Sequence, residues 1–300
     1  MARTLLIQKE ATNEGNIGTQ VFKLDTGLLF HGLHIVNNVP GNPININDLL
    51  SLNYQIDGTD YIPATMDGPT FDAINQVDGL PAFNGQDFYI PFDLEGMKDQ
   101  RLRELTGVNT GIASKASGKI ITNHTLRLRW AVAVDVTVYA DVEPNTPDGP
   151  GVVRRFTPQD KNSSNGMTSF SDFDYATPQF AWWRRIFTKA SVGNVLQAQL
   201  SSPKAMVWGE KVPKAAADQA LVLGKKVPGA FWSYIMDFTA TGSGYTAQAR
   251  VDAQGAVQSD TPNNPMLQTD QFKDTSLKLS LWNDQAGTNQ FWLESVGEIE

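Results

Sequence analysis

The chain has 300 residues, 41% of them hydrophobic and 19% charged, so it can bury the core of one large domain or of two ordinary ones. A formal net charge of −8 argues against a general nucleic-acid-binding protein, which needs a basic face. No cysteine is present, which excludes disulfide bonds and thiolate metal sites. The sequence has neither the long apolar stretch of a signal peptide nor that of a membrane span, so we expect a soluble protein that folds in the cytoplasm.

Alternation of apolar and polar residues is the main pattern of the sequence, and it is typical of β-strands. Residues 29–35 form a weak alternating segment. In residues 126–142 every even position is apolar. This longer segment is either one very long strand or two strands joined without a shift of parity. Residues 232–238 and 245–251 alternate in the same way.

Clusters of Gly, Pro, Asn and Asp between these segments predict turns, for example at residues 67–69. Only two segments carry helix signals. Residues 97–106 end before Gly107, and residues 213–223 begin with a proline and end before Gly224. Many strands with turn-rich connections and few helices favour β-sandwiches or barrels.

The middle of the chain differs from both flanks. The segment from Pro144 to Pro178 is rich in Gly, Asn, Ser and Pro and lacks sustained apolar alternation. We therefore place an inter-domain linker there. The expected organisation is a first β domain over residues 1–150, a linker over residues 151–178 and a second β domain over residues 179–300.

The two flanks also resemble each other in sequence. The segment at residues 126–130 recurs at residues 277–282, an offset of 151, and residues 88–93 recur loosely at residues 233–238, an offset of 145. The two matches have the same order and a nearly constant offset of half the chain. They predict an internal duplication, in which the strands that begin near Leu126 and Leu277 occupy equivalent places.

Three further segments bear a likeness to one protein family. The segment FAWWRRIFTK, from Phe180 to Lys189, is similar to the Trp, Arg-Arg, Phe, Lys segment that opens the second half of that family. Residues 52–59 resemble its strand ending in Asp-Gly. Residues 102–111, followed by the strand from Leu126, resemble its helix-then-strand order. With the tandem β domains, these segments resemble the double jelly-roll major capsid proteins of tailless, internal-membrane-containing icosahedral bacteriophages of the corticovirus type.

The resemblance implies an all-β fold of two tandem eight-stranded jelly rolls with short helices in loops. It implies a homotrimer whose six sandwiches form a pseudo-hexagonal capsomer of an icosahedral shell over an internal membrane. The implied partners are neighbouring capsomers, the penton and minor capsid or membrane proteins, with possible lipid contact and no direct nucleic-acid contact. The implied location is the virion, after assembly in the host cytoplasm.

The sequence lacks the common catalytic and metal-binding motifs, so we predict no enzymatic activity and no catalytic, cofactor or metal site. His31 and His34 lie three apart in an expected strand, so their side chains point to opposite faces and make a poor metal pair. His124 is the third histidine. For all three, a packed or surface histidine is the interpretation we favour.

Acidic and amide side chains leave two alternatives open. Two carboxylate pairs have the residue types of a glycosidase site, whose spatial separation a sequence does not give. A cluster of oxygen ligands suits Ca²⁺, although loop capping is the favoured interpretation. The carboxylate pairs are Asp57 with Asp60 and Asp93 with Glu95, and the Ca²⁺ candidates are Asn45, Asn47 and Asp48.

Arg184, Arg185 and Lys189 form the one dense basic cluster beside aromatic residues, with Lys225 and Lys226 further on. One interpretation is contact with anionic lipid or a neighbouring subunit. The other is a solvated or salt-bridged face without a partner.

Three functions are consistent with these patterns. The first is a capsid structural protein. The second is a carbohydrate- or receptor-binding β-sandwich, such as a viral spike or a lectin-like protein. The third is a β-sandwich glycosidase or lyase. Glycan binding by the monomer favours the second, and turnover lost on substitution of one carboxylate favours the third.

Overall fold

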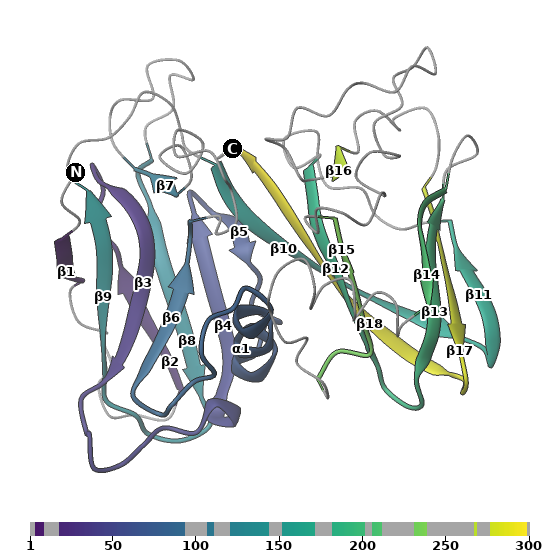
Figure 1. Ribbon diagram of the computed structural model, residues 1–300. Helices are drawn as coiled ribbons and strands as arrows, with labels where there is room; N and C mark the ends of the chain where they lie inside the picture. Colours follow the sequence, from purple (N-terminus) through teal and green to yellow (C-terminus); the bar gives the residue numbers. More distant parts are fainter. Residues whose placement is uncertain are drawn as a thin grey trace. The chain divides into compact units, whose positions relative to one another are not determined.

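The computed structural model describes residues 4–8, 18–93, 107–110, 121–143, 152–171, 182–201, 206–211, 231–238, 267–268 and 277–298. The chain divides into two compact units, each built largely of β-sheet (Figure 1). The first comprises residues 1–75, 80–155 and 297–300, and the second comprises residues 76–79 and 156–296.

The first unit contains two antiparallel sheets (Figure 1). One has the order β1-β9-β3-β6, with a short strand β7 that also pairs with β3. The other has the order β2-β8-β4-β5. Apart from the β4–β5 hairpin, neighbours in these sheets are not consecutive in the sequence, which is the Greek-key exchange of a jelly roll. The bounds are β1 Thr4–Gln8, β2 Gly18–Lys23, β3 Leu29–Asn37, β4 Leu49–Ile56, β5 Thr59–Ile62, β6 Asp87–Pro91, β7 Val108–Asn109, β8 His124–Trp130 and β9 Val136–Glu143.

The second unit repeats this arrangement. Its sheets have the orders β10-β18-β12-β15, with β16 also pairing β12, and β11-β17-β13-β14. The bounds are β10 Val152–Ser163, β11 Gly166–Phe170, β12 Trp182–Ala190, β13 Val195–Ser201, β14 Met206–Lys211, β15 Tyr234–Asp237, β16 Leu267–Gln268, β17 Lys278–Asn283 and β18 Gly287–Glu298.

Adding nine to each strand number of the first unit gives the strand order of the second in both sheets. Within the described residues, each unit has two sheets whose main paths contain four strands each. One extra two-residue strand pairs at the side of the path in one of the two sheets. The predicted all-β fold of two tandem jelly rolls is confirmed. The sequence repeat also matches the topology, because β6 corresponds to β15 and β8 corresponds to β17.

The segment at residues 126–142 is two strands, the second of the alternatives that its pattern allowed. β8 and β9 lie in different sheets of the first unit. Leu126 and Leu128 of β8 and Val138 of β9 are fully buried, whereas Arg127 and Arg129 are exposed. The alternation continues from β8 into β9 without a shift because both strands direct their even-numbered residues into the core between the sheets. Each large apolar side chain buried there contributes about 1.5–3 kcal/mol.

The second unit has a separate core. Aromatic and aliphatic side chains of β12, β13, β15, β17 and β18 are buried together, among them Trp183, Ile186, Leu200, Met236, Leu281 and Phe291. The alternation predicted at residues 232–238 corresponds to β15 and its flanks, while residues 245–251 lie outside the described residues.

The predicted linker over residues 151–178 is wrong. β10 and β11 occupy much of it, and the division between the units falls between Arg155 and Phe156, inside β10. β10 is the edge strand of the sheet β10-β18-β12-β15, and its residues are largely polar and half-buried. Backbone pairing with β18 suffices to form such an edge strand, so no apolar alternation marks it in the sequence.

The turn predicted at residues 67–69 is the start of a helix, α1 (Gly68–Val77). The Asp67 carboxylate accepts a hydrogen bond from the Thr70 backbone nitrogen at 2.8 Å, and Pro69 stands in the first turn. A capping Asp followed by an early Pro is a helix-start signal, and the same residue types also favour turns, which is why the sequence predicts a turn here. A 3-10 turn, η1, spans Ile46–Asp48.

The helices predicted at residues 97–106 and 213–223 lie outside the described residues. In the part of the chain that the structure describes, no helix has the length and apolar character needed to cross a membrane.

Candidate functional site

Arg184 and Arg185, the basic pair singled out in the sequence, lie at the centre of a buried ion network in the second unit. Their side chains are 4% and 1% exposed. Three equally buried carboxylates surround them, those of Asp78, Asp237 and Glu294. We call these five residues the buried ion network.

Each arginine contacts more than one carboxylate. Arg184 donates hydrogen bonds to Glu294 Oε1 at 2.7 Å and to Asp78 Oδ1 at 3.0 Å. Arg185 donates to Asp237 Oδ2 at 2.8 Å and to Asp78 Oδ1 at 2.5 Å. One oxygen of Asp78 is therefore shared by both guanidinium groups.

A β-bulge makes this convergence possible. Consecutive residues of a regular strand point to opposite faces. In the pairing of β12 with β18, Trp183 opposes Ser295 and Arg185 opposes Glu294, so Arg184 is the extra residue. Bulges bend a strand and redirect a side chain. The bulge explains how two adjacent arginines reach the same carboxylates.

The network keeps its arginines charged. Burial alone lowers the pKa of the Arg185 guanidinium, but the charges of Asp237, Asp78 and Glu294 outweigh that effect and raise its pKa above the ordinary value. Burial and the neighbouring Arg185 lower the pKa of Arg184, and Asp78 and Glu294 more than compensate, so its pKa is also raised.

For Arg184 and Arg185, contact with lipid or a neighbouring subunit is therefore wrong, because neither side chain reaches the surface. The second interpretation, a solvated or salt-bridged face, is correct about the salt bridges. The pair is buried, however, and does not lie on a solvated face. Lys189 lies apart from the network, with its Nζ 4.0 Å from the centroid of the Phe231 ring, in a cation–π contact. Lys225 and Lys226 lie outside the described residues.

His31 and His34 of β3 have separate carboxylate partners. His31 is buried, and its Nδ1 lies 2.7 Å from Asp93 Oδ1. His34 is partly exposed, and its Nδ1 lies 2.9 Å from Asp87 Oδ2. Within the described ranges, no group of three or more His, Asp and Glu residues is placed to hold a metal ion.

His124 is buried in the first unit. Its Nε2 lies 2.5 Å from the Tyr54 hydroxyl and its Nδ1 lies 3.3 Å from the Asp25 carbonyl oxygen. Burial lowers the pKa of His124 to about 4, although the Asp25 carbonyl and the Asp57 charge act in the opposite direction. The neutral ring then accepts from Tyr54 and donates to Asp25.

The other acidic and amide candidates serve loops and turns. Asp57, at a positive φ of 47°, accepts hydrogen bonds from the Thr122 and Asn123 backbone nitrogens. Asp60 accepts from Asn53 and Gln55. The Asn45 side chain accepts from the Asn47 backbone nitrogen, which is the expected loop capping at η1. Glu95 lies outside the described residues.

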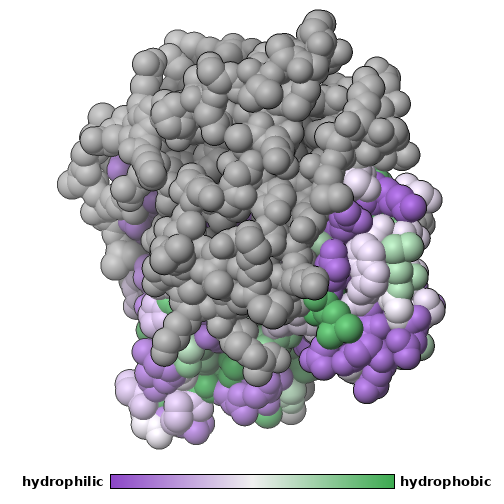
Figure 2. All heavy atoms as spheres, turned by 45° about the vertical axis from the view of Figure 1, so that its right-hand side comes forward, coloured by the Kyte–Doolittle hydropathy of each residue, from purple (hydrophilic) through white to green (hydrophobic). Residues whose placement is uncertain are grey.

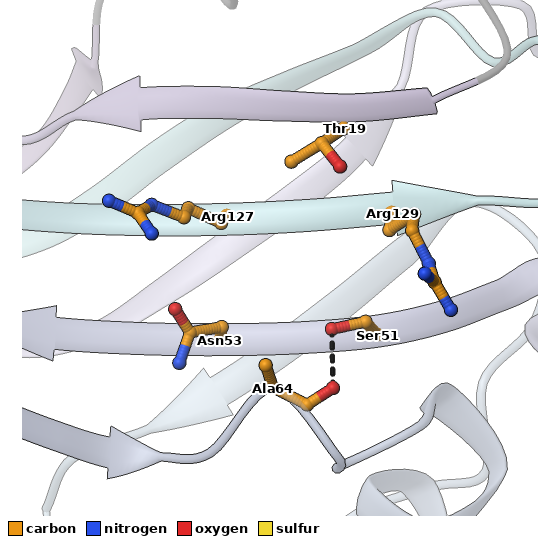
Figure 3. Close-up of a pocket in the computed structure, with 6 residues that line it drawn as sticks. All are labelled: Thr19, Ser51, Asn53, Ala64, Arg127 and Arg129. Carbon is orange, nitrogen blue, oxygen red and sulfur yellow. Dashed lines mark hydrogen bonds between the residues drawn. The ribbon is translucent and has the colours of Figure 1, made fainter.

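A pocket on the outer face of the sheet β2-β8-β4-β5 is the surface feature that sequence reasoning missed. It has a volume of about 240 Å³ and is lined by Thr19, Ser51, Asn53, Ala64, Arg127 and Arg129 (Figure 3). Arg127 and Arg129 stand on either side of polar groups from β2 and β4 (Figure 3). The signal was present in the sequence, since both arginines fall at odd, outward-facing positions of the alternating segment.

The second unit presents a different surface on the corresponding sheet. Met167 of β11 is 58% exposed and Leu196 of β13 is 54% exposed. Trp282 of β17, which is half-buried, pairs with Met167 on one side and with Gln197 on the other. The described surface in Figure 2 is mainly hydrophilic, with small separate hydrophobic areas.

No protein-family model and no curated protein sequence matches the chain. Solved structures do match it. The major capsid protein P2 from bacteriophage PM2 has a TM-score of 0.72 at 14% identity, over 100% of this chain and 98% of that chain.

Two further matches are to particles of other viruses. The structure of Sulfolobus turreted icosahedral virus gives a TM-score of 0.62 at 10% identity, over 99% of this chain and 91% of the matched chain. The capsid of the virus PBCV-1 gives 0.58 at 8% identity, over 98% and 93% of the two chains. The likeness spans both units, so this chain has the double jelly-roll fold found in viral major capsid proteins.

Proposed function

We propose that this chain is a major capsid protein, the repeated structural subunit of an icosahedral viral shell. The observation that carries the proposal is the repeated strand order of the two units, together with a likeness to capsid protein P2 of bacteriophage PM2 that covers the whole chain. Each jelly roll satisfies most of its backbone hydrogen bonds internally, which protects strand edges in a protein packed at high density.

The proposed assembly unit is a homotrimer. Two equivalent jelly rolls in each of three copies give six similar sandwiches, so a three-fold ring fills a pseudo-hexagonal position in a shell. Closed rotational symmetry satisfies every copy-to-copy interface. Neighbouring capsomers, penton and minor capsid or membrane proteins are the further partners, over an internal membrane, in a virion assembled in the host cytoplasm.

The proposed role is structural and not enzymatic. In the described residues, the buried carboxylates of the second unit are neutralised by arginines, and Asp57 and Asp60 hold turns and neighbouring amides. A hydrolytic rate on a glycan or ester that disappears on substitution of one carboxylate would contradict this.

The assembly proposal is tested by native mass spectrometry of the purified chain. The expected species has three times the mass of the 32.9 kDa chain. Electron microscopy at higher protein concentration should show hexagonal tiles or closed shells. A chain that stays monomeric over the whole concentration range, or that binds defined glycans as a monomer, would instead favour a receptor-binding β-sandwich.

A further inference from the structure

Arg127 and Arg129 differ from the other arginines that the structure describes. Arg184 and Arg185 are held by carboxylates, and Arg154 and Arg155 also have interaction partners. Neither Arg127 nor Arg129 forms a hydrogen bond or ion pair with any residue in the described ranges, and both are exposed. In a chain with 32 acidic and 24 basic residues, two neighbouring cations that have no carboxylate partner in the described part of the chain are open to an anion from outside.

The sheet fixes both arginines on one face. They are two residues apart on β8, so their side chains emerge on the same side, about 7 Å apart along the strand. The register places Asn53 opposite Arg127 on β4, and Thr19 opposite Arg129 on β2. No carboxylate stands directly opposite either arginine in this register.

The pocket between the arginines has a polar floor. The Ser51 hydroxyl donates to the Ala64 carbonyl oxygen at 2.7 Å, which holds the floor in place (Figure 3). The Asn53 amide nitrogen donates to Asp60 and to the Ile62 carbonyl, so its orientation is fixed. Figure 3 shows the oxygen of Asn53 and the hydroxyl of Thr19 both on the side of β8, the strand between them.

The size of the pocket limits what can fill it. Pockets for drug-sized ligands have volumes of roughly 300–1,000 Å³. The volume of about 240 Å³ suits a small oxyanion or the end of one side chain. A guanidinium group binds a carboxylate through two parallel hydrogen bonds, so two of them select an acidic group.

We propose that this Arg127–Arg129 pocket binds an acidic side chain of a second copy of the chain, an inference that rests on the proposed capsid function. Copies with a net charge of −8 repel one another, so close packing requires local opposite charge. Arg127 and Arg129, exposed and without a carboxylate partner among the described residues, provide that opposite charge on an acidic protein. The partner is therefore a copy that presents one of its exposed carboxylates.

The second jelly roll does not repeat the pair, which makes the site specific to the first. At the repeat offset, Lys278 of β17 corresponds to Arg127 and Ser280 corresponds to Arg129. Ser280 is buried and its hydroxyl bonds that of Ser169 at 2.8 Å. A contact through the pocket therefore uses the first unit of the copy that carries the arginines.

The test compares the double variant Arg127→Gln, Arg129→Gln with the wild type and with Lys278→Gln, which removes an exposed charge at the equivalent position. Association is measured by sedimentation velocity in 50 mM and 500 mM NaCl. We expect the double variant to associate at least tenfold more weakly at low salt, and the difference to shrink at high salt because ions screen the contact. We expect Lys278→Gln to associate like the wild type.

Circular dichroism melting establishes that each variant is folded. If the double variant does not fold, the single variants Arg127→Gln and Arg129→Gln carry the same comparison. Calorimetric titration of the wild type with inorganic phosphate forms a second arm. Phosphate binding that the double variant loses, with unchanged association, would show a small-anion site and overturn the inference.

Different experimental outcomes contradict the proposed role of the pocket and the proposed capsid function. If the wild type associates and the double variant associates equally well, the pocket is not an interface, while the capsid proposal stands. The same holds if Lys278→Gln weakens association as much as the double variant, because general charge is then the cause. If the wild type never associates, both are contradicted.

Discussion

At the scale of single residues, the buried ion network is the most consequential arrangement in the second unit. Two arginines and three carboxylates are buried together, and each charge is neutralised by the opposite charges of its neighbours. A buried ion pair adds little compared with a well-packed apolar replacement, but loss of one partner leaves an uncompensated buried charge. The network therefore makes the second unit sensitive to substitution at any of its five positions.

Arg185→Met should destabilise the protein by about 3–5 kcal/mol, because Asp237 loses its arginine and Asp78 loses one of two. Denaturant unfolding followed by tryptophan fluorescence measures the loss, since Trp183 and Trp292 are buried in the second unit. The control Lys278→Met, at an exposed position of the same unit, should change the free energy of unfolding by less than about 0.5 kcal/mol. Equal effects of the two substitutions would contradict this account.

His124 should give the first unit a pH-dependent stability. Its pKa is about 4 in the folded protein, against 6.5 for an ordinary histidine, so the unfolded chain binds more protons between these values. The free energy of unfolding should therefore be at its full value above pH 6.5 and fall as the pH drops toward 4. The loss is on the order of 3 kcal/mol.

Unfolding measured from pH 7 to pH 4.5 tests this contribution. His124→Gln cannot be protonated in this range, so it should flatten the profile while lowering stability at pH 7. His34→Gln, at a partly exposed histidine, is the control, and the slope lost in His124→Gln beyond that lost in this control is assigned to His124. A wild-type slope retained in His124→Gln would assign the pH dependence to other groups.

At the scale of elements, short local devices decide where strands and helices begin and change direction. The bulge at Arg184 redirects one side chain of β12, and the Asp67 carboxylate starts α1. The bulge acts through a register shift of one residue, and the Asp67 carboxylate acts through one hydrogen bond.

Asp67→Ala should cost about 1 kcal/mol, because the Thr70 backbone nitrogen loses its capping acceptor. Asp67→Asn is the matched control, since asparagine caps helices about as well as aspartate. Chemical denaturation of the two variants beside the wild type provides the measurement. A loss in Asp67→Asn as large as that in Asp67→Ala would show that charge, and not capping, matters at this position.

At the scale of the whole molecule, duplication gives one chain two similar sandwiches with different surfaces. The sheet β2-β8-β4-β5 exposes Arg127 and Arg129, whereas the equivalent sheet of the second unit exposes Met167 and Leu196. The cores are alike in pattern and the outer faces are not. Such a division suits a subunit whose two halves meet different neighbours, as the proposed capsid role requires.

If the chain forms a trimer, its thermal stability should depend on concentration, because association stabilises only the folded state. Differential scanning calorimetry at protein concentrations spanning a hundredfold should show a Tm that rises with concentration. The increase should be smaller in the double variant Arg127→Gln, Arg129→Gln than in the wild type. A constant Tm in the wild type would speak against a trimer that dissociates on unfolding.

The sequence by itself determined the β architecture and its duplication. Period-two alternation is a local consequence of strand geometry, so residues 126–142 revealed their buried and exposed faces without any tertiary information. The repeat at offsets of 151 and 145 residues identified β8 with β17 and β6 with β15, which the strand order confirms. Both signals lie in the order of residues along the chain.

Only the tertiary structure determined which charged residues are buried in ion pairs and which are exposed. Asp78 lies 106 residues before Arg184, and no local pattern could have placed its carboxylate against that guanidinium. β10 formed where a linker was expected, because an edge strand is held by backbone hydrogen bonds that leave no apolar pattern. Strand pairing between distant segments fixed which arginines were buried with carboxylates and which remained open at the surface.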